Sequence, residues 1–358
     1  MKRVLCLCNT YYQLIFAFQL KRCMYERDYF LLLISDHSKG AEGLAVRISK
    51  LNVFDDVRFV ATKSIDYTDS KFNSKMQHVD DIFEFINDAT FDEFLFYNIS
   101  QSTTFLFSRL YAKNKNIQCS RFEEGILSYG SFLKHIPVTS SWYVNHAVYC
   151  IRKIIPQINY IDRVRHFYCY YPQVYKGKFE AIALPLINKN EFGEKIVQAF
   201  GVNYIELQYN EKYIFFTSVY DFEGGESIGE FELVKKIADV VGKENLLIKM
   251  HPRDTRTVYV DEGFHIDTNS SVPFEALLFA YDFSDKVLLT ATSGAVLSAS
   301  LMLENPPETY YMYPLCKLDG NPTAQKTIEQ VDQVLCHESM RDQLQKIHVC
   351  NCVRDIVH

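Results

Sequence analysis

The sequence lacks the signatures of several common classes of protein. It has no uninterrupted apolar run of about 18 residues, which a membrane-spanning helix needs, and its basic and then apolar start breaks at Asn9-Thr10, too early for a signal peptide. It has no GxGxxG fingerprint, GxxxxGK[ST] loop, HExxH or nucleophile elbow, so dehydrogenase, NTPase, zincin and hydrolase activities lose their main support. We expect a cytoplasmic protein that is at most peripheral to the inner face of the cell membrane.

Two further absences narrow the class of protein. None of the ten cysteines belongs to a CxxC pair with zinc spacing, so we expect reduced thiols that pack as small apolar residues. The formal net charge is −6, which argues against a nucleic-acid binder because nonspecific affinity for phosphate backbones comes from a basic surface.

One segment departs from the acidic balance. Between Ile151 and Phe179, basic residues such as Arg163 and Arg165 are interleaved with aromatic residues such as Tyr168 and Tyr171. This mixture suits contact with an anionic membrane surface. The alternative, which we favour, is a solvated connector between two domains.

Apolar runs of strand length alternate with amphipathic stretches, the pattern of strand–helix–strand units with a parallel sheet. The 358 residues suggest two domains, and the pattern restarts in the second half. The predicted strands are Val4 to Cys8, Tyr29 to Ile34, Val57 to Val60, Glu93 to Tyr97, Ile117 to Ser120, Tyr213 to Thr217, Asn245 to Met250, Lys286 to Thr290 and Thr309 to Met312. The clearest predicted helices are Tyr11 to Met24, Glu230 to Val241 and Gly294 to Leu303. We therefore expect an α/β fold of two Rossmann-like domains facing a cleft, with ligands at the strand ends.

Two of the strand ends carry ionisable residues. The motif Glu123-Glu124-Gly125 can place one acid in a cleft, where the neighbouring charge raises its affinity for a proton. The alternative is an acidic turn with a left-handed glycine. The motif His251-Pro252-Arg253 brings an imidazole and a guanidinium to the end of a strand.

The other two strand ends carry hydroxyl groups. Thr292-Ser293-Gly294 opens a helix, where hydroxyls and backbone N–H groups hold phosphate, although a plain N-cap gives the same pattern. Ser218 and Asp221 follow another strand, before a loop with Gly224 and Gly225 that can close over a ligand.

Taken together, these clusters resemble the bacterial sialyltransferases, above all glycosyltransferase family 52, the lipooligosaccharide and capsule sialyltransferase group. The four motifs occur in that family's order across most of the chain, and the opening Cys8-Asn9-Thr10-Tyr11-Tyr12-Gln13 resembles its strand-to-helix entry. The resemblance implies a GT-B fold and an inverting transfer of sialic acid from CMP-sialic acid to a terminal sugar of a bacterial surface glycan. Galactose is the acceptor sugar that we expect.

The resemblance also assigns roles to residues. His251 lies beside the departing phosphate as general acid or electrostatic stabiliser, and Glu275 accepts hydrogen bonds from the ribose. The phosphate and the rest of the donor are held by Ser218, Pro252, Arg253, Thr292, Ser293 and Gly294. Residues 1–175 form an N-terminal domain on the acceptor side and residues 176–330 a C-terminal domain on the donor side. Residues 331–358 form a helical tail.

The general base is left open by the same resemblance. Family 52 points to Asp221, whereas related sialyltransferase families point to the paired acids, Glu124 or Glu123. The chain has Glu where family 52 usually has Asp in this pair, and a Gly-rich insertion follows Asp221. We favour Asp221 over Glu124 and expect Glu123 to be structural, because a crowded pair tends to keep one proton.

No cofactor or metal is expected, because CMP-sialic acid is a substrate and Asp80-Asp81 is a poor match to the Asp-x-Asp of metal-dependent enzymes. The expected partners are the donor and a glycan acceptor, with a homodimer left open. The alternatives are a GT-B enzyme that uses another nucleotide sugar and a noncatalytic glycan-binding subunit.

Overall fold

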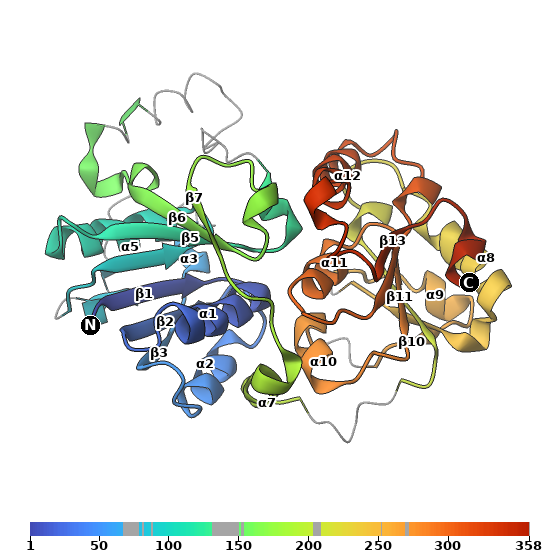
Figure 1. The fold of residues 1–358 in the computed structure, drawn as a ribbon, viewed down its shortest axis with the longest axis horizontal. Coiled ribbons are helices and arrows are strands. Elements are labelled where there is room, and N and C mark those ends of the chain that lie inside the picture. Colours follow the sequence, from blue (N-terminus) through green and yellow to red (C-terminus); the bar gives the residue numbers. More distant parts are fainter. Residues whose placement is uncertain are drawn as a thin grey trace. The chain divides into compact units, whose positions relative to one another are not determined.

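The computed structural model of the chain describes residues 1–66, 79–80, 82–86, 89–130, 150–151, 154–202, 209–251, 253–268 and 272–357. The chain divides into two compact units. The first unit contains Met1–Glu124 and Gly130–Pro185, and the second contains Gly125–Tyr129 and Leu186–His358. Figure 1 labels the elements of both units.

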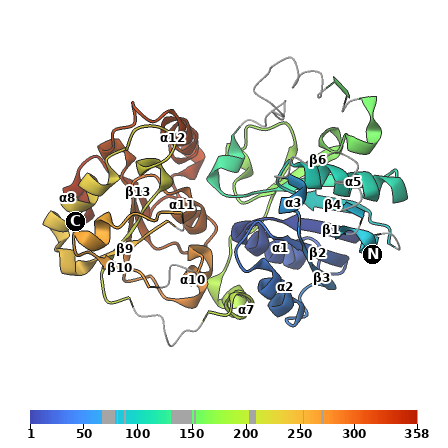
Figure 2. The same cartoon turned by 180° about the vertical axis from the view of Figure 1, so that it is seen from behind.

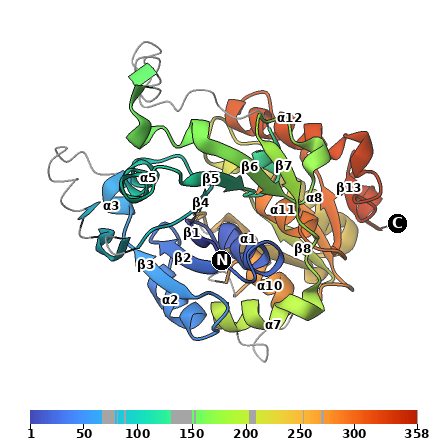
Figure 3. The same ribbon diagram turned by 60° about the vertical axis from the view of Figure 1, so that its left-hand side comes forward.

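The first unit is built on a seven-stranded sheet with the order β3-β2-β1-β4-β5-β6-β7, in which every pair of neighbours is parallel. Its strands are β1 (Arg3–Cys8), β2 (Tyr29–Ser35), β3 (Asp56–Val60), β4 (Glu93–Phe96), β5 (Gln118–Phe122), β6 (Val164–Cys169) and β7 (Glu180–Ala183). Its helices include α1 (Tyr11–Cys23), α2 (Ala41–Ser49), α3 (Lys63–Asp66) and α5 (Gln101–Lys113). Figure 3 shows α1 and α2 on one face of this sheet and α5 on the other.

The second unit has a six-stranded parallel sheet with the order β10-β9-β8-β11-β12-β13, seen from behind in Figure 2. Its strands are β8 (Tyr213–Phe216), β9 (Leu246–Lys249), β10 (His265–Ile266), β11 (Val287–Thr290), β12 (Glu308–Tyr311) and β13 (Ile347–Val349). Its helices include α7 (Lys189–Phe200), α8 (Glu230–Val241), α9 (Val258–Asp261), α10 (Phe274–Ala280), α11 (Gly294–Leu301) and α12 (Pro322–Leu335).

The central strands form where both faces of the chain are apolar. All four residues of β8, β9 and β11 are buried, and β1 buries every residue after Arg3. Strands covered on both faces read as continuous apolar runs, which is why the sequence predicts them. The predicted α/β class with two parallel sheets is confirmed.

We expected the basic segment between Ile151 and Phe179 to be a solvated connector, but this segment is part of the first unit. Arg152 and Lys153 lie outside the described residues, but the segment also contributes β6, which pairs with β5 and β7. Its aromatic residues Tyr160, Phe167, Tyr168, Tyr170 and Tyr171 are buried. Most of the aromatic surface that we considered for membrane contact therefore packs inside the first unit.

The boundaries of the units also differ from the prediction. The first unit extends to Pro185 rather than to residue 175, because β7 pairs with β6 and belongs to the first sheet. The expected helical tail over residues 331–358 is helical only to the end of α12 and in short 3-10 turns. Beyond α12, β13 adds to the edge of the second sheet beside β12, so the tail is part of that unit.

Two further expectations from the sequence concern the cysteines and the absence of a membrane-spanning helix. All ten cysteines are free thiols. Within the described ranges no helix combines the length and apolar character that a membrane crossing requires.

Gly125 is held in a position that a larger residue cannot occupy. Its φ is +79°, and a Cβ at this residue would lie 2.8 Å from the Cβ of Ser298 in α11 and closer still to its hydroxyl. The same hydroxyl accepts a hydrogen bond of 3.1 Å from the N–H of Ile126. The turn that follows the paired acids therefore depends on glycine both for its backbone and for its space.

We predict that Gly125→Ala lowers the free energy of unfolding by about 2 to 4 kcal/mol, because left-handed strain and overpacking add. Gly229→Ala is the matched control, since Gly229 has a φ of +76° and no atom within 4 Å of an added Cβ. Urea unfolding of both variants measures the difference. Equal losses in the two variants would show that contact with Ser298 contributes nothing.

Candidate active site

Threonine hydroxyls hold the carboxyl ends of three neighbouring strands of the second sheet together. Thr217 follows β8, and its hydroxyl accepts a hydrogen bond of 2.8 Å from the N–H of His251, which follows β9. Thr290 ends β11, donates 3.0 Å to the carbonyl of Phe216 and accepts 2.9 Å from the N–H of Ser293. The three predicted clusters around His251, Ser218 and Ser293 therefore start from one braced edge.

Thr292 lies at the point in this edge where strand order changes direction, between β8 and β11. It is 1% exposed, and its hydroxyl has no hydrogen-bond partner among the described residues. After Ser293, which is the N-cap, α11 begins at Gly294 with no acid in its first turn. The first N–H groups of a helix lack intrahelical partners and carry positive partial charge, so this arrangement suits an anion such as phosphate.

The geometry of His251 fixes which ring nitrogen carries the proton. The N–H of Arg253 donates 3.1 Å to Nδ1, so a neutral ring holds its proton on Nε2. Burial, and then the charge of Arg253, lower the pKa of His251 from its ordinary value of 6.5. At neutral pH the half-buried side chain therefore offers a neutral Nε2–H donor, and the choice between general acid and electrostatic stabiliser that the sequence left for His251 stays a prediction.

The remaining predicted donor-binding residues are Arg253, Glu275 and Pro252. Arg253 forms an exposed ion pair of 3.0 Å with Glu223. Glu275 lies in the first turn of α10, and burial raises the pKa of its carboxyl. Pro252 lies outside the described residues.

The carboxylate of Asp221 is held by three donors. One oxygen accepts from the hydroxyl of Ser227 and, at 3.0 Å, from the N–H of Glu230, and the other pairs with Arg256 at 2.8 Å. Burial acts to raise the pKa of Asp221, but the hydrogen bonds from Ser227 and Arg256 outweigh it, so the pKa is lowered. A buried carboxylate held in this way positions the loop and the start of α8, and is poorly placed to take a proton from an acceptor.

Sequence reasoning missed the two partners that define this environment. Arg256 forks onto Asp254 at 2.9 and 2.7 Å in addition to Asp221, and nothing in the spacing of the sequence distinguishes it from Arg253. Glu230, which is fully buried at the start of α8, accepts the N–H of Ser218 at 3.0 and 3.1 Å. Burial is the main cause that raises the pKa of Glu230 to about 8.

Asn321 holds the Gly-rich loop that we expected to close over a ligand. Its side-chain NH2 group donates to the carbonyls of Tyr220, Glu223 and Glu226 at 2.9, 2.9 and 3.1 Å, and its oxygen caps α12 through Ala324. The loop is therefore fastened to the start of α12. A single Asn between Gly320 and Pro322 reads in the sequence only as a helix cap.

The paired acids lie in the first unit, at the end of β5. Glu123 is 2% exposed and accepts 2.5 Å from the hydroxyl of Tyr12 and 3.0 Å from the N–H of Tyr170, as a structural residue does. Glu124 is half-buried. It lies close enough to Cys8, at the end of β1, and to Arg121 for its charge to act on both side chains.

Metal ligands were not expected, and among the described residues no three His, Cys, Asp or Glu side chains are grouped so that they could hold an ion. Metal independence stays a prediction, since it concerns the reaction. The second unit offers hydroxyl, imidazole and helix N–H donors at its strand ends. The first unit, described by itself, offers a half-buried carboxylate at the end of β5.

Comparison with known proteins agrees with this arrangement. The chain matches the family model described as "Alpha-2,8-polysialyltransferase (POLYST)" over residues 4–309. No curated protein sequence matches it significantly. The expected resemblance to bacterial sialyltransferases is therefore confirmed through this family.

Two solved structures share the fold. One is an α/β-galactoside α-2,3-sialyltransferase from Photobacterium phosphoreum, with 13% identity, a TM-score of 0.51 and coverage of 99% of this chain and 98% of that one. The other is the GT-B domain of a sialyltransferase from Photobacterium damselae, with 11% identity, a TM-score of 0.52 and coverage of 97% and 99%. At this identity the likeness establishes the GT-B fold.

We predict that Glu230→Gln changes the dependence of stability on pH. Because the folded pKa is raised from 4.5 to about 8, the stability associated with a protonated Glu230 is complete below pH 4.5 and is lost as the pH rises through 8. Relative to wild type, the variant should therefore gain roughly 1 kcal/mol per pH unit between pH 5 and 8. Urea unfolding across this range measures the gain.

Glu232→Gln, on the exposed face of the same helix, is the control and should show no such trend. A difference between Glu230→Gln and wild type that stays constant with pH would contradict the raised pKa.

Proposed function

The chain belongs to the alpha-2,8-polysialyltransferase family, and we propose that it transfers sialic acid from CMP-sialic acid to the terminal sugar of a glycan, with inversion. The observation that carries this proposal is the unpartnered hydroxyl of Thr292 at the start of α11. This site suits a phosphate, and the leaving group of CMP-sialic acid is a phosphate monoester.

In the proposed reaction, the bond between the anomeric carbon and the phosphate oxygen breaks, and the electron pair leaves with CMP. Thr292, Ser293 and the N–H groups of α11 hold the phosphate, and the Nε2–H of His251 donates to an oxygen on which charge develops. Donors that are already fixed in place stabilise this charge without reorganisation. We therefore propose that no metal is needed.

The acceptor hydroxyl must lose its proton as its oxygen attacks the anomeric carbon. We propose Glu124 as the base, because Asp221 is committed to Arg256, Ser227 and the N–H of Glu230. Protonation of Asp221 would break a buried ion pair, whereas Glu124 is only half-buried, at the carboxyl end of β5. This reverses the order that the sequence favoured, and places Asp221 in support of the donor site.

The family name points to an acceptor sugar other than the galactose that we expected from the sequence. The name describes transfer onto sialic acid through an α-2,8 linkage, so we propose an acceptor that ends in sialic acid. Galactose remains the alternative, since the fold is shared with an enzyme that acts on galactosides.

The test is a turnover assay with purified chain. CMP-sialic acid and UDP-sugars are offered with lactose and with sialyllactose, and nucleotide release and glycan products are measured. The proposal expects products only from CMP-sialic acid, with sialyllactose as the better acceptor. Turnover of a UDP-sugar would contradict CMP-sialic acid as the donor. Products formed on lactose alone would support galactose as the acceptor sugar.

We predict that Thr292→Val weakens CMP binding by about tenfold or more and leaves cytidine binding unchanged, since the lost hydroxyl contacts a charged phosphate. Titration calorimetry with both ligands measures this. Thr104→Val, in α5 of the first unit, is the matched control and should bind both ligands as wild type does. Equal losses of CMP and cytidine affinity in Thr292→Val would rule out a phosphate contact.

We predict that Glu124→Gln lowers kcat by about 10²-fold or more, with CMP affinity and thermal stability unchanged. Asp221→Asn should instead lower stability by about 3 kcal/mol, because it removes one of the two buried carboxylates that pair with Arg256. Steady-state kinetics and thermal unfolding of both variants separate the two roles. Full transfer by Glu124→Gln, together with a folded but inactive Asp221→Asn, would return the base to Asp221.

A further inference from the structure

The first sheet has its own point at which strand order changes direction. From β1 the chain proceeds to β2 and β3 on one side, and β4 then pairs with the other side of β1. Ligands of open α/β sheets bind beyond the carboxyl ends of the strands at such a point. The residues there are Asn9 after β1, the loop after β2, and Asn98 after β4.

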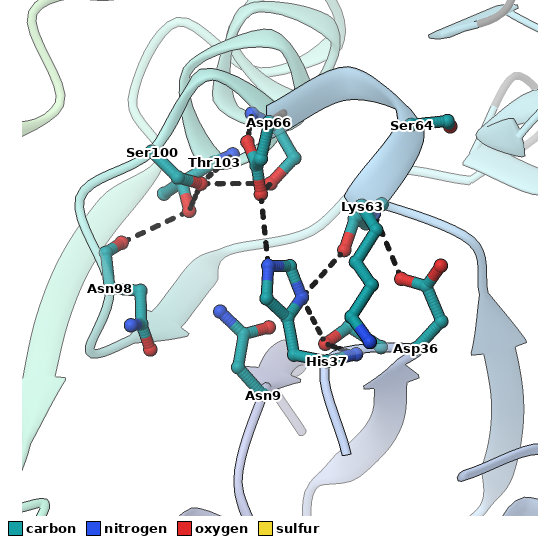
Figure 4. Close-up of polar contacts among 12 residues, drawn as sticks. Asn9, Asp36, His37, Lys63, Ser64, Asp66, Asn98, Ser100 and Thr103 are labelled. Carbon is teal, nitrogen blue, oxygen red and sulfur yellow. Dashed lines mark hydrogen bonds and ion pairs between the residues drawn. The ribbon is translucent and has the colours of Figure 1, made fainter. Parts of the chain in front are cut away.

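Asn9 is fixed at this point through its backbone. Its N–H donates 2.7 Å to the side-chain oxygen of Gln13, and its carbonyl accepts 2.9 Å from the hydroxyl of Ser38. Gln13 in turn donates 2.7 Å to the side chain of Asn98, which ties the ends of β1 and β4 together. Figure 4 shows the side chains of Asn9, Asn98 and His37 near one another.

The side-chain oxygen of Asn9, in contrast, is left without a partner among the described residues. It is 5% exposed, and its amide oxygen has no hydrogen-bond partner in the part of the chain that the structure describes. Directly after it, α1 begins with Thr10 as its cap and without an acid in its first turn. A buried amide oxygen rarely stays unpaired in a folded protein, so this atom requires an explanation.

The neighbouring polar groups do not supply a partner, because they are bonded elsewhere. Nδ1 of His37 lies 3.0 Å from the hydroxyl of Ser35 and 3.3 Å from that of Thr62, and Nε2 lies 3.5 Å from Asp66. Asp66 accepts the N–H and hydroxyl of Ser102. These bonds engage the groups around Asn9 and leave its amide oxygen without a partner among the described residues.

We propose that the side-chain amide of Asn9 binds hydroxyl groups of the acceptor's terminal sugar. The unpaired oxygen is an acceptor, so it takes a hydroxyl rather than a carboxylate or a phosphate, and the NH2 group donates to a second sugar oxygen. The inference rests on the proposed function, which requires an acceptor on this side.

The position of Glu124 agrees with this assignment. Its charge acts on Cys8, the residue before Asn9. An acceptor sugar held by Asn9 therefore lies on the same strand ends as the proposed base, which needs a hydroxyl within hydrogen-bond reach.

The test compares wild type with Asn9→Ala, using sialyllactose and lactose as acceptors. We expect the acceptor KM to rise about tenfold or more, while CMP affinity and hydrolysis of CMP-sialic acid without acceptor stay unchanged. The melting temperature should not fall, because the removed oxygen has no protein partner. Asn116→Ala is the control. It removes an exposed amide that precedes the amino end of β5, away from the strand ends that carry Asn9, and should change none of these values.

An unchanged acceptor KM in a folded Asn9→Ala protein would overturn the proposal, as would an equal loss of CMP affinity. If Asn9→Ala does not fold, the isosteric Asn9→Asp, which lacks the NH2 donors, is expected to raise the acceptor KM and is judged by the same criteria. If wild type turns over no donor, the proposed function fails. Binding of the acceptor sugars to wild type and Asn9→Ala, measured by calorimetry, then decides the role of Asn9 by itself.

Discussion

In both sheets every pair of neighbouring strands is parallel, and this constraint decides where chemistry occurs. Parallel strands bring all their carboxyl ends to one edge, so polar residues that are far apart in sequence meet there. In the second unit, Thr217 and Thr290 brace this edge with hydrogen bonds to His251 and Ser293. The strand interiors supply rigidity, and the loops supply the functional groups.

The buried charges of the second unit link the segments that follow its strands. Arg256 joins Asp254 to Asp221, and Asp221 holds the N–H of Glu230 at the start of α8. A carboxylate with three donors is stable as an anion but costs energy to protonate. In our proposal Asp221, which the sequence favoured as the base, is therefore a support, and spacing alone does not make this distinction.

The sequence predicts the parts of the fold that are buried on both sides, such as β1, β8 and β11, because continuous apolar runs mark them. It does not predict β7 or β13, which carry exposed residues at the sheet edges, or the two-residue strand β10. It also misses β6, although most of its residues are buried, because this strand lies in the basic and aromatic segment that we expected to be a connector. The strand-end clusters with Thr292 and His251 are visible because hydroxyl and imidazole groups follow an apolar run. Arg256 and Asn321 are not visible, since their roles come from partners far away in sequence or from the path of a loop.

A shared physical signature links the two units. At the point where strand order reverses in each sheet, a buried side-chain oxygen next to a helix start has no partner within the described ranges: Asn9 in the first unit and Thr292 in the second. The chemistry of the two atoms differs. A threonine hydroxyl can donate to a phosphate, whereas an amide oxygen only accepts, so it selects a hydroxyl. Each unpaired atom therefore matches one of the two substrates that sialic acid transfer requires.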